Sequence, residues 1–154
     1  MISRTLTLFC LVGLCLTFVH CGGDDPKPPE PTQKEIVTEK LVAGGSSWSA
    51  STSGAGITVD GVDVTNEFFD GFTIKFTGTT LTTTGTTPVW LRTDTWTFKD
   101  DNATAIIRGQ DNKEVAITSI SDTELKLTLQ WDQTTYEGGR TRSIPGTYVF
   151  TLKK

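Results

Sequence analysis

The sequence predicts an all-β fold: eight antiparallel strands in up-and-down order, closed into a barrel and preceded by one short helix. Three observations predict it. Threonine, a β-branched residue that favours strands, occurs 29 times, mostly beyond Gly45. Apolar and polar residues alternate in several segments there, which is typical of strands buried on one face. Turn-forming Gly, Asp and Asn residues separate these segments, as in hairpins.

The single predicted helix covers residues 33–42. Thr32 and Glu35 have the spacing of a capping box, in which each residue accepts a hydrogen bond from the other's backbone N–H. Apolar residues follow at helical spacing, and Gly44-Gly45 ends the segment. One apolar stripe of this size suits a helix that covers an open end or side of a sheet.

The alternation predicts strands at about 46–52, 71–77, 80–84, 92–98, 103–109, 113–120, 123–131 and 145–153. Residues 53–70 form the longest connection and have room for a short strand of their own, since Ile57, Val59 and Val62 are apolar. Consecutive hairpins of this kind form a meander. A meander of eight strands can close on itself, which removes its exposed edges.

Several segments resemble the lipocalin-like domains of Bacteroidetes surface lipoproteins. The segments are Gly45 to Trp48 directly after the helix, and residues 70–76, 95–98, 138–140 and 146–152. The resemblance covers about residues 33–154. It implies a barrel, an exported location and, often, no assigned activity.

Residues 1–20 have the pattern of an export signal. Arg4 lies near the start, and a mostly apolar run without charge extends from Leu6 to Val19. This run is shorter than the ~18–20 residues that span a bilayer as a helix. Cys21 follows, which resembles the bacterial lipobox, where the cysteine is acylated and becomes the new N-terminus. We therefore predict a lipoprotein signal peptide over 1–20 and lipidation, with acyl chains such as palmitate, at Cys21.

Residues 21–32 are predicted to be a lipidated, Pro-rich tether. Asp24 and Asp25 resemble the surface-export signal of Bacteroidetes lipoproteins, which implies the outer face of the outer membrane. Residues 27–31 hold three of the six prolines and would extend at ~3.1 Å per residue. Two alternatives stay open: an ordinary cleaved signal with an incidental cysteine, and a tether that is acidic only because it is solvated.

Composition excludes several classes of function. Without residues 1–20 the chain has 13 basic and 18 acidic residues, and it lacks a basic run, so nucleic acid is not an expected partner. His20, Cys10 and Cys15 all lie in the predicted signal. Once Cys21 is acylated, no imidazole or thiol remains for a Ser-His-Asp triad, a Cys-His pair, a histidine zinc site or a disulfide. We expect neither an enzyme nor a cofactor.

Paired carboxylates are the remaining candidates for catalysis or metal binding. The pairs are Asp60 with Asp63, Asp100 with Asp101, and Asp111 with Glu114. Glycosidases use two carboxyl groups ~5–10 Å apart across a cleft. Each pair here lies in or beside a predicted turn, where aspartate is ordinary. Two of these turns, residues 60–63 and 100–102, are candidates for calcium binding, but neither has the spacing of an EF-hand calcium loop. We therefore predict no catalytic and no metal-binding residue.

Large aromatic residues gather on the apolar faces of the predicted strands. They are Phe72, Phe76, Trp96, Phe98, Trp131, Tyr148 and Phe150. An eight-stranded barrel is about the size at which side chains either fill the interior or leave room for one small ligand. Seven large rings in a domain of this length favour filling over a cavity wall.

Two residues in predicted loops are candidates for contact with a ligand or partner. Trp90, beside Pro88, either stacks on a sugar or a partner or folds beneath its loop. Arg140, in the last loop, either pairs with an anionic ligand or ties down the loop through a nearby carboxylate. Both alternatives stay open for each residue.

Together these patterns predict a lipoprotein anchored to the outer membrane, at the cell surface, that acts as a non-enzymatic binding or interaction module. Its expected partners are the membrane, through the lipid, and a small apolar or glycan ligand or an outer-membrane protein. The first alternative is a carrier of a lipid or glycan with an open barrel cavity. The second is a hydrolase that depends on carboxylates alone.

Overall fold

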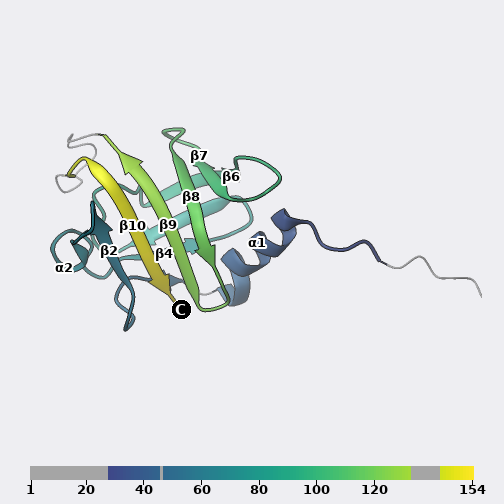
Figure 1. Cartoon of the computed structure of the whole chain (residues 1–154), viewed down its shortest axis with the longest axis horizontal. Coiled ribbons are helices and arrows are strands. Elements are labelled where there is room, and N and C mark those ends of the chain that lie inside the picture. Colours follow the sequence, from purple (N-terminus) through teal and green to yellow (C-terminus); the bar gives the residue numbers. More distant parts are fainter. Residues whose placement is uncertain (1–27, 46, 133–142) are drawn as a thin grey trace, which may run out of the picture. The chain divides into compact units, whose positions relative to one another are not determined.

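The computed structural model describes residues 28–45, 47–132 and 143–154. Pro31–Lys154 forms one compact unit, and it contains all the helices and strands described below. Figure 1 shows this unit as a curved sheet with short helices. Within the described ranges, no helix has the length and apolar character needed to cross a membrane.

One antiparallel sheet contains all the described strands. They are β1 (Trp48–Ser49), β2 (Gly56–Val59), β3 (Val62–Asp63), β4 (Thr73–Phe76), β5 (Thr80–Thr84), β6 (Thr93–Phe98), β7 (Ala105–Arg108), β8 (Glu114–Ile120), β9 (Glu124–Trp131) and β10 (Gly146–Lys153). From β4 to β10 each strand pairs with the next, and β1 pairs with both β4 and β10. The sheet therefore closes into the predicted eight-stranded up-and-down barrel.

The closure depends on β10, which has two neighbours on one side. Near its end, Lys153 pairs with Ser49 of β1, and further back residues 148–151 pair with β2. β3 pairs with β2, so these two strands form a hairpin attached to the barrel. The long connection over 53–70 thus holds two strands and a helical turn, α2 (Thr65–Phe68). The sequence did not predict α2, because four residues are too few to show a helical period.

The predicted helix is confirmed as α1 (Gln33–Val42). Its capping box is present: Thr32 Oγ1 accepts from the Glu35 N–H at 3.3 Å, and Glu35 Oε2 accepts from the Thr32 N–H at 2.7 Å. A 3-10 turn, Ala43–Gly45, follows the helix. Gly44 has φ 68°, in the left-handed region that ends helices and favours glycine.

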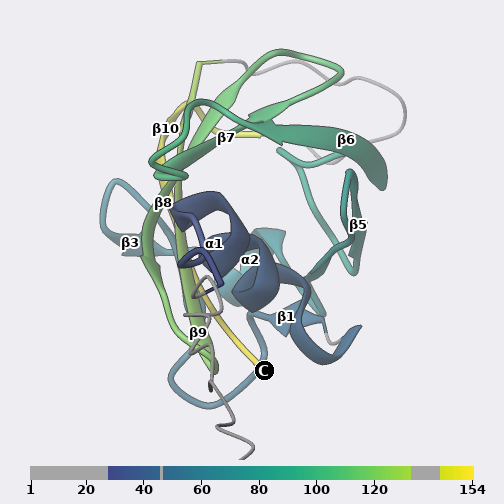
Figure 2. The ribbon, with the colours of Figure 1, turned by 90° about the vertical axis from the view of Figure 1, so that its right-hand side faces the viewer.

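The two helices lie at opposite ends of the barrel. In Figure 2, α1 lies in front of the ring of strands and α2 behind it. Val37 and Leu41 are the buried residues of α1, and the helix contacts β4 and β8. The Trp48 indole N–H donates to the Leu41 carbonyl at 3.1 Å, which fixes the last turn of the helix to the first strand. The expectation that this helix covers an end of the sheet is confirmed.

Inward side chains form one continuous core. Buried and less buried residues alternate along β5, β9 and β10, as a half-buried sheet requires. Phe150 lies at the centre of an aromatic group: its ring centroid is 5.5 Å from that of Phe69, 5.8 Å from Phe72 and 5.6 Å from Trp90. Burial of each such ring contributes about 1.5–3 kcal/mol. Among the described residues, packed side chains occupy the barrel interior.

Candidate functional site

Three strand ends place charged and aromatic side chains together at the barrel end away from α1. Arg108 is the last residue of β7, Lys113 directly precedes β8, and Trp131 is the last residue of β9. Because β7 pairs with β8 and β8 with β9, these three residues lie in a row across neighbouring strands. The Arg108 N–H donates to the Lys113 carbonyl at 3.0 Å, which extends the pairing to this row.

Trp90 joins the row from the loop between β5 and β6. Thr87 Oγ1 accepts the Trp90 backbone N–H at 3.1 Å, and this turn directs the loop inward. Trp90 is only 1% exposed and its ring lies against Phe150. The prediction of an exposed, sugar-stacking Trp90 is therefore wrong, and the alternative in which it folds beneath its loop is what the structure has. The physical reason is the hydrophobic effect: packing the indole ring into the apolar core removes its apolar surface from water, which is favourable.

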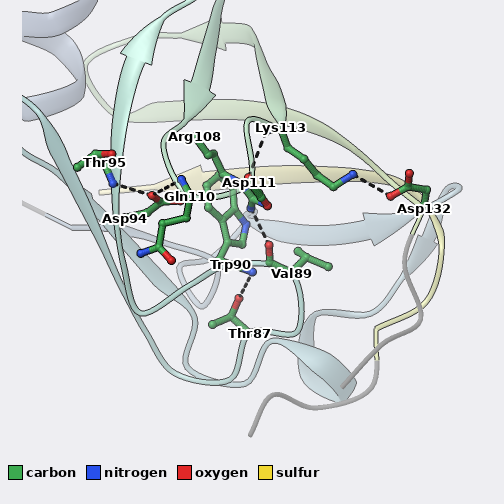
Figure 3. A network of polar contacts seen from close by, with 10 residues as sticks. All are labelled: Thr87, Val89, Trp90, Asp94, Thr95, Arg108, Gln110, Asp111, Lys113 and Asp132. Carbon is green, nitrogen blue, oxygen red and sulfur yellow. Dashed lines mark hydrogen bonds and ion pairs between the residues drawn. The ribbon is translucent and has the colours of Figure 1, made fainter. Parts of the chain in front are cut away.

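Arg108 is the centre of the cluster. The residue is 2% exposed, and its guanidinium carbon lies 5.0 Å from the ring centroid of Trp90 and 5.6 Å from that of Trp131. Nη1 donates to the Val89 carbonyl at 2.6 Å, Nε donates to Asp111 Oδ1 at 3.0 Å, and Nη2 donates to Asp111 Oδ2. Figure 3 shows this network. The bidentate contact with the Asp111 carboxylate and the ring faces of Trp90 and Trp131 offset the cost of burying the guanidinium charge.

The residues around Asp111 lower the pKa of its carboxyl group. Burial of its carboxylate tends to raise the pKa, but the hydrogen bonds and charge of Arg108, with the backbone N–H and charge of Lys113, outweigh that effect. The pKa of Asp111 therefore lies below its ordinary value of 3.8. Asp111 is ionised at neutral pH, and its charge compensates that of Arg108.

A second ion pair continues the cluster toward solvent. Lys113 Nζ lies 2.8 Å from Asp132 Oδ1 and 5.2 Å from the ring centroid of Trp131. The Lys113 side chain is 19% exposed and that of Asp132 is 74% exposed. The hydrogen bond from Lys113, a backbone hydrogen bond and the lysine charge lower the pKa of Asp132. Charged groups thus lead from the surface to the buried guanidinium.

Two donors in this cluster have no acceptor among the residues that the structure describes. Trp90 Nε1 and Trp131 Nε1 are buried and make no hydrogen bond to any of them. An unpaired buried donor costs about 1–3 kcal/mol. The other two tryptophans differ: Trp48 Nε1 donates to Leu41 O, and Trp96 Nε1 lies 3.2 Å from both Thr77 O and Thr80 O. The indoles of Trp90 and Trp131 each present a ring face to the Arg108 guanidinium.

A buried carboxylate on β6 supports the turn that carries Asp111. Asp94 is 3% exposed, and its Oδ1 accepts from the backbone N–H groups of Thr95 at 2.7 Å and Gln110 at 3.1 Å. Gly109 packs directly against β6, because a Cβ there would lie 1.8 Å from Thr95 Oγ1. Any larger residue at position 109 would require the Thr95 side chain to move. The turn over 109–112 is therefore held on one side by β6.

The predicted carboxylate pairs serve as structural groups. Asp63, Asp100 and Asp111 each accept the backbone N–H two residues further on, as aspartate does in turns. The remaining members have other partners: Asp60 accepts from the Thr147 N–H, Asp101 pairs with Lys34 and Glu114 with Lys99. In the described part of the chain, no three His, Cys, Asp or Glu side chains gather as they would around a metal ion.

The predicted site residues have different outcomes. Cys21 and Arg140 lie outside the described residues, and Trp90 is buried as described above. Sequence reasoning did not single out Arg108, and it placed Trp131 only among core aromatics. One signal was present: Arg108 follows Ile106 by two residues, so the strand period directs it to the same inward face.

No protein-family model matches the chain, and neither a curated protein nor a solved structure matches it significantly.

Proposed function

We propose that this protein is an exported lipoprotein, anchored through acylated Cys21, that displays a lipocalin-like barrel as a non-enzymatic binding or interaction module on the outer membrane. The anchor in this proposal comes from the sequence pattern before Pro31. A barrel hosts many functions, so the binding role has to be argued from particular residues.

The observation on which this proposal rests is the packing of aromatic side chains inside the barrel. Phe69, Phe72, Trp90 and Phe150 pack ring against ring in the middle of the barrel. A carrier with an open cavity would need this volume for its ligand. The packing supports a rigid scaffold that contacts a ligand or partner at a barrel end or on its outer surface, rather than a carrier that encloses one.

Substitution of Cys21 by serine tests the anchor. Cells that make the wild-type chain are expected to retain it in the outer-membrane fraction, with radiolabelled palmitate incorporated. The Cys21→Ser chain is expected to appear in the soluble fraction without label, because more than one acyl chain is needed for a stable anchor. Cys15→Ser is the matched control, since it removes a thiol from the same region, and it should behave as the wild type.

Membrane retention of the Cys21→Ser chain would contradict the anchor. The binding role has its own readout: a glycan or lipid retained by the purified chain should be recovered with its covalent structure unchanged by mass spectrometry. A cleaved product would contradict a non-enzymatic module and favour a hydrolase.

A further inference from the structure

We propose that a cavity between α1 and the turn that joins β8 to β9 is a binding site for a small zwitterion, namely an amino acid with an apolar side chain. The inference rests on the proposed binding role, and it names a site and a ligand class for that role.

The cavity has a volume of about 320 Å³ and is lined by one face of α1 and by the β8–β9 turn. The lining residues are Ile36, Glu39, Lys40, Ala43 and Asp122. Those from the helix end have the spacing i, i+3, i+4 and i+7, so they share one helix face. Small-molecule sites occupy ~300–1,000 Å³, and this volume at the lower end of that range suits a ligand the size of an amino acid.

Both walls of the cavity are held in place by hydrogen bonds. On the helix side, Lys154 Nζ donates to the carbonyls of Lys40 at 3.2 Å and Ala43 at 3.4 Å. On the other side, Ser121 Oγ accepts from the Glu124 N–H at 3.0 Å, and the Ser121 N–H donates to the Glu124 carbonyl at 2.8 Å. These bonds close the turn, and α1 also contacts β8 (Figure 2). The cavity is therefore formed before a ligand arrives.

Three charged side chains of the lining are not engaged by the protein itself. Within the part of the chain that the structure describes, the side chains of Glu39, Lys40 and Asp122 make no hydrogen bond or ion pair. A carboxylate only accepts hydrogen bonds when ionised, and an ammonium only donates them. The cavity thus offers two acceptor groups of negative charge and one donor group of positive charge to a ligand.

The two signs of charge select the ligand class. A ligand with an ammonium group alone pairs with the carboxylates but brings a like charge to Lys40. A ligand with a carboxylate alone pairs with Lys40 but is repelled by Glu39 and Asp122. A zwitterion supplies an ammonium for the carboxylates and a carboxylate for the lysine. Ile36 and Ala43 add apolar surface, which favours an apolar side chain on the amino acid.

The experiment follows methyl signals at the cavity by nuclear magnetic resonance. The full chain is labelled with ¹³C in its methyl groups and held in an uncharged polyoxyethylene detergent, and Ile36 and Ala43 report on the cavity. Val62, which is 67% exposed on β3 and does not line the cavity, is the internal control. Leucine is titrated at constant ionic strength. The matched comparisons are leucinamide, which lacks the carboxylate, and N-acetylleucine, which lacks the ammonium.

Leucine is expected to shift the Ile36 and Ala43 signals saturably, while the Val62 signal stays in place. Leucinamide and N-acetylleucine should each bind at least tenfold more weakly than leucine, because each has lost one of the two charged groups that the cavity pairs with. Glycine, which lacks a side chain, should also bind more weakly than leucine, because it makes no apolar contact.

Four variants test the charges of the lining. Glu39→Gln and Asp122→Asn should each weaken leucine binding at least fivefold. Lys40→Gln should also weaken leucine at least fivefold but strengthen leucinamide about threefold, because it removes the like charge. Damage to the fold would weaken both ligands, so this opposite change is specific to a charge contact. Glu67→Gln is the matched control: Glu67 is exposed on α2 outside the cavity, and its replacement should leave both affinities unchanged.

The site is wrong if leucine leaves the Ile36 and Ala43 signals in place, or if leucine, leucinamide and N-acetylleucine bind equally well. Saturable shifts of other methyl signals alone would also overturn the site, but would leave the proposed binding role standing. Release of the Cys21→Ser chain from membranes is measured separately, so failure of the anchor and failure of this site remain distinguishable.

Discussion

Arg108 and Asp111 form an ion pair at one end of the barrel, between a buried guanidinium and a partly exposed carboxylate. The guanidinium is permanently charged and almost fully buried, and three of its N–H groups are hydrogen-bonded. Breaking a buried ion pair is costly, because the remaining charge loses its partner. Asp111 is 30% exposed on its side chain, so water compensates part of that loss.

We expect Asp111→Asn to lower the free energy of unfolding at pH 7 by about 2–3 kcal/mol, somewhat below the ~3–5 kcal/mol typical of a fully buried pair. Urea unfolding followed by tryptophan fluorescence measures it. Asp101→Asn is the control: Asp101 pairs with Lys34 but its side chain is 96% exposed, so the expected loss is at most about 1 kcal/mol. Equal losses in both variants would contradict the importance of burial.

The same pair predicts a pH dependence. The folded-state pKa of Asp111 lies below 3.8, its ordinary value, so the stability from its ionised form is fully present above that value. The stability is lost as pH falls through the folded-state pKa. The difference in unfolding free energy between wild type and Asp111→Asn should therefore be constant from pH 7 to about 5 and shrink below about pH 4. A difference that is unchanged at pH 2–3 would argue against this ionisation.

At the scale of elements, α1 is fixed to the barrel at its C-terminal end. Lys154, after the last strand, donates from Nζ to the carbonyls of Lys40 at 3.2 Å and Ala43 at 3.4 Å. The same ammonium lies 4.2 Å from the ring centroid of Trp48. A positive charge at a helix C-terminus is favourable, and a cation over an aromatic face adds to it. The two ends of the unit thus stabilise each other.

Replacement of Lys154 by methionine keeps an unbranched apolar side chain but removes the charge and the donors. We expect the free energy of unfolding to fall by about 1 kcal/mol, from the lost helix-end and cation–π contacts. Lys153→Met is the matched control, because Lys153 approaches Glu124 only to 3.9 Å and should contribute less than about 0.5 kcal/mol. Urea unfolding of both variants compares them, and an equal effect would contradict the assigned role of Lys154.

At the scale of the whole molecule, closure of the barrel and filling of its interior depend on each other. β10 pairs with β9, β1 and β2, and it also contributes Phe150 to the centre of the core. One strand therefore joins the ends of the sheet and supplies the ring around which the other aromatics pack. Loss of that ring leaves a cavity that the curved sheet cannot collapse to fill.

We expect Phe150→Ala to lower the free energy of unfolding by about 3–5 kcal/mol, the usual range for removal of a buried phenylalanine ring. Val149→Ala, one residue earlier on the other face of β10, is the control and should cost at most about 1 kcal/mol. Thermal unfolding followed by circular dichroism measures both. Similar midpoints for the two variants would contradict a core centred on Phe150.

The sequence alone determined the eight barrel strands, the capped helix and the inward face of the strands over 71–77, 123–131 and 145–153. Those features follow from local rules: the strand period, the capping-box spacing and the turn residues act over a few positions in the chain. The tertiary structure decided that β10 joins β1 and β2, that Trp90 turns inward, and that Arg108 meets two indoles. These depend on which distant segments become neighbours when the sheet closes, and no local pattern encodes that.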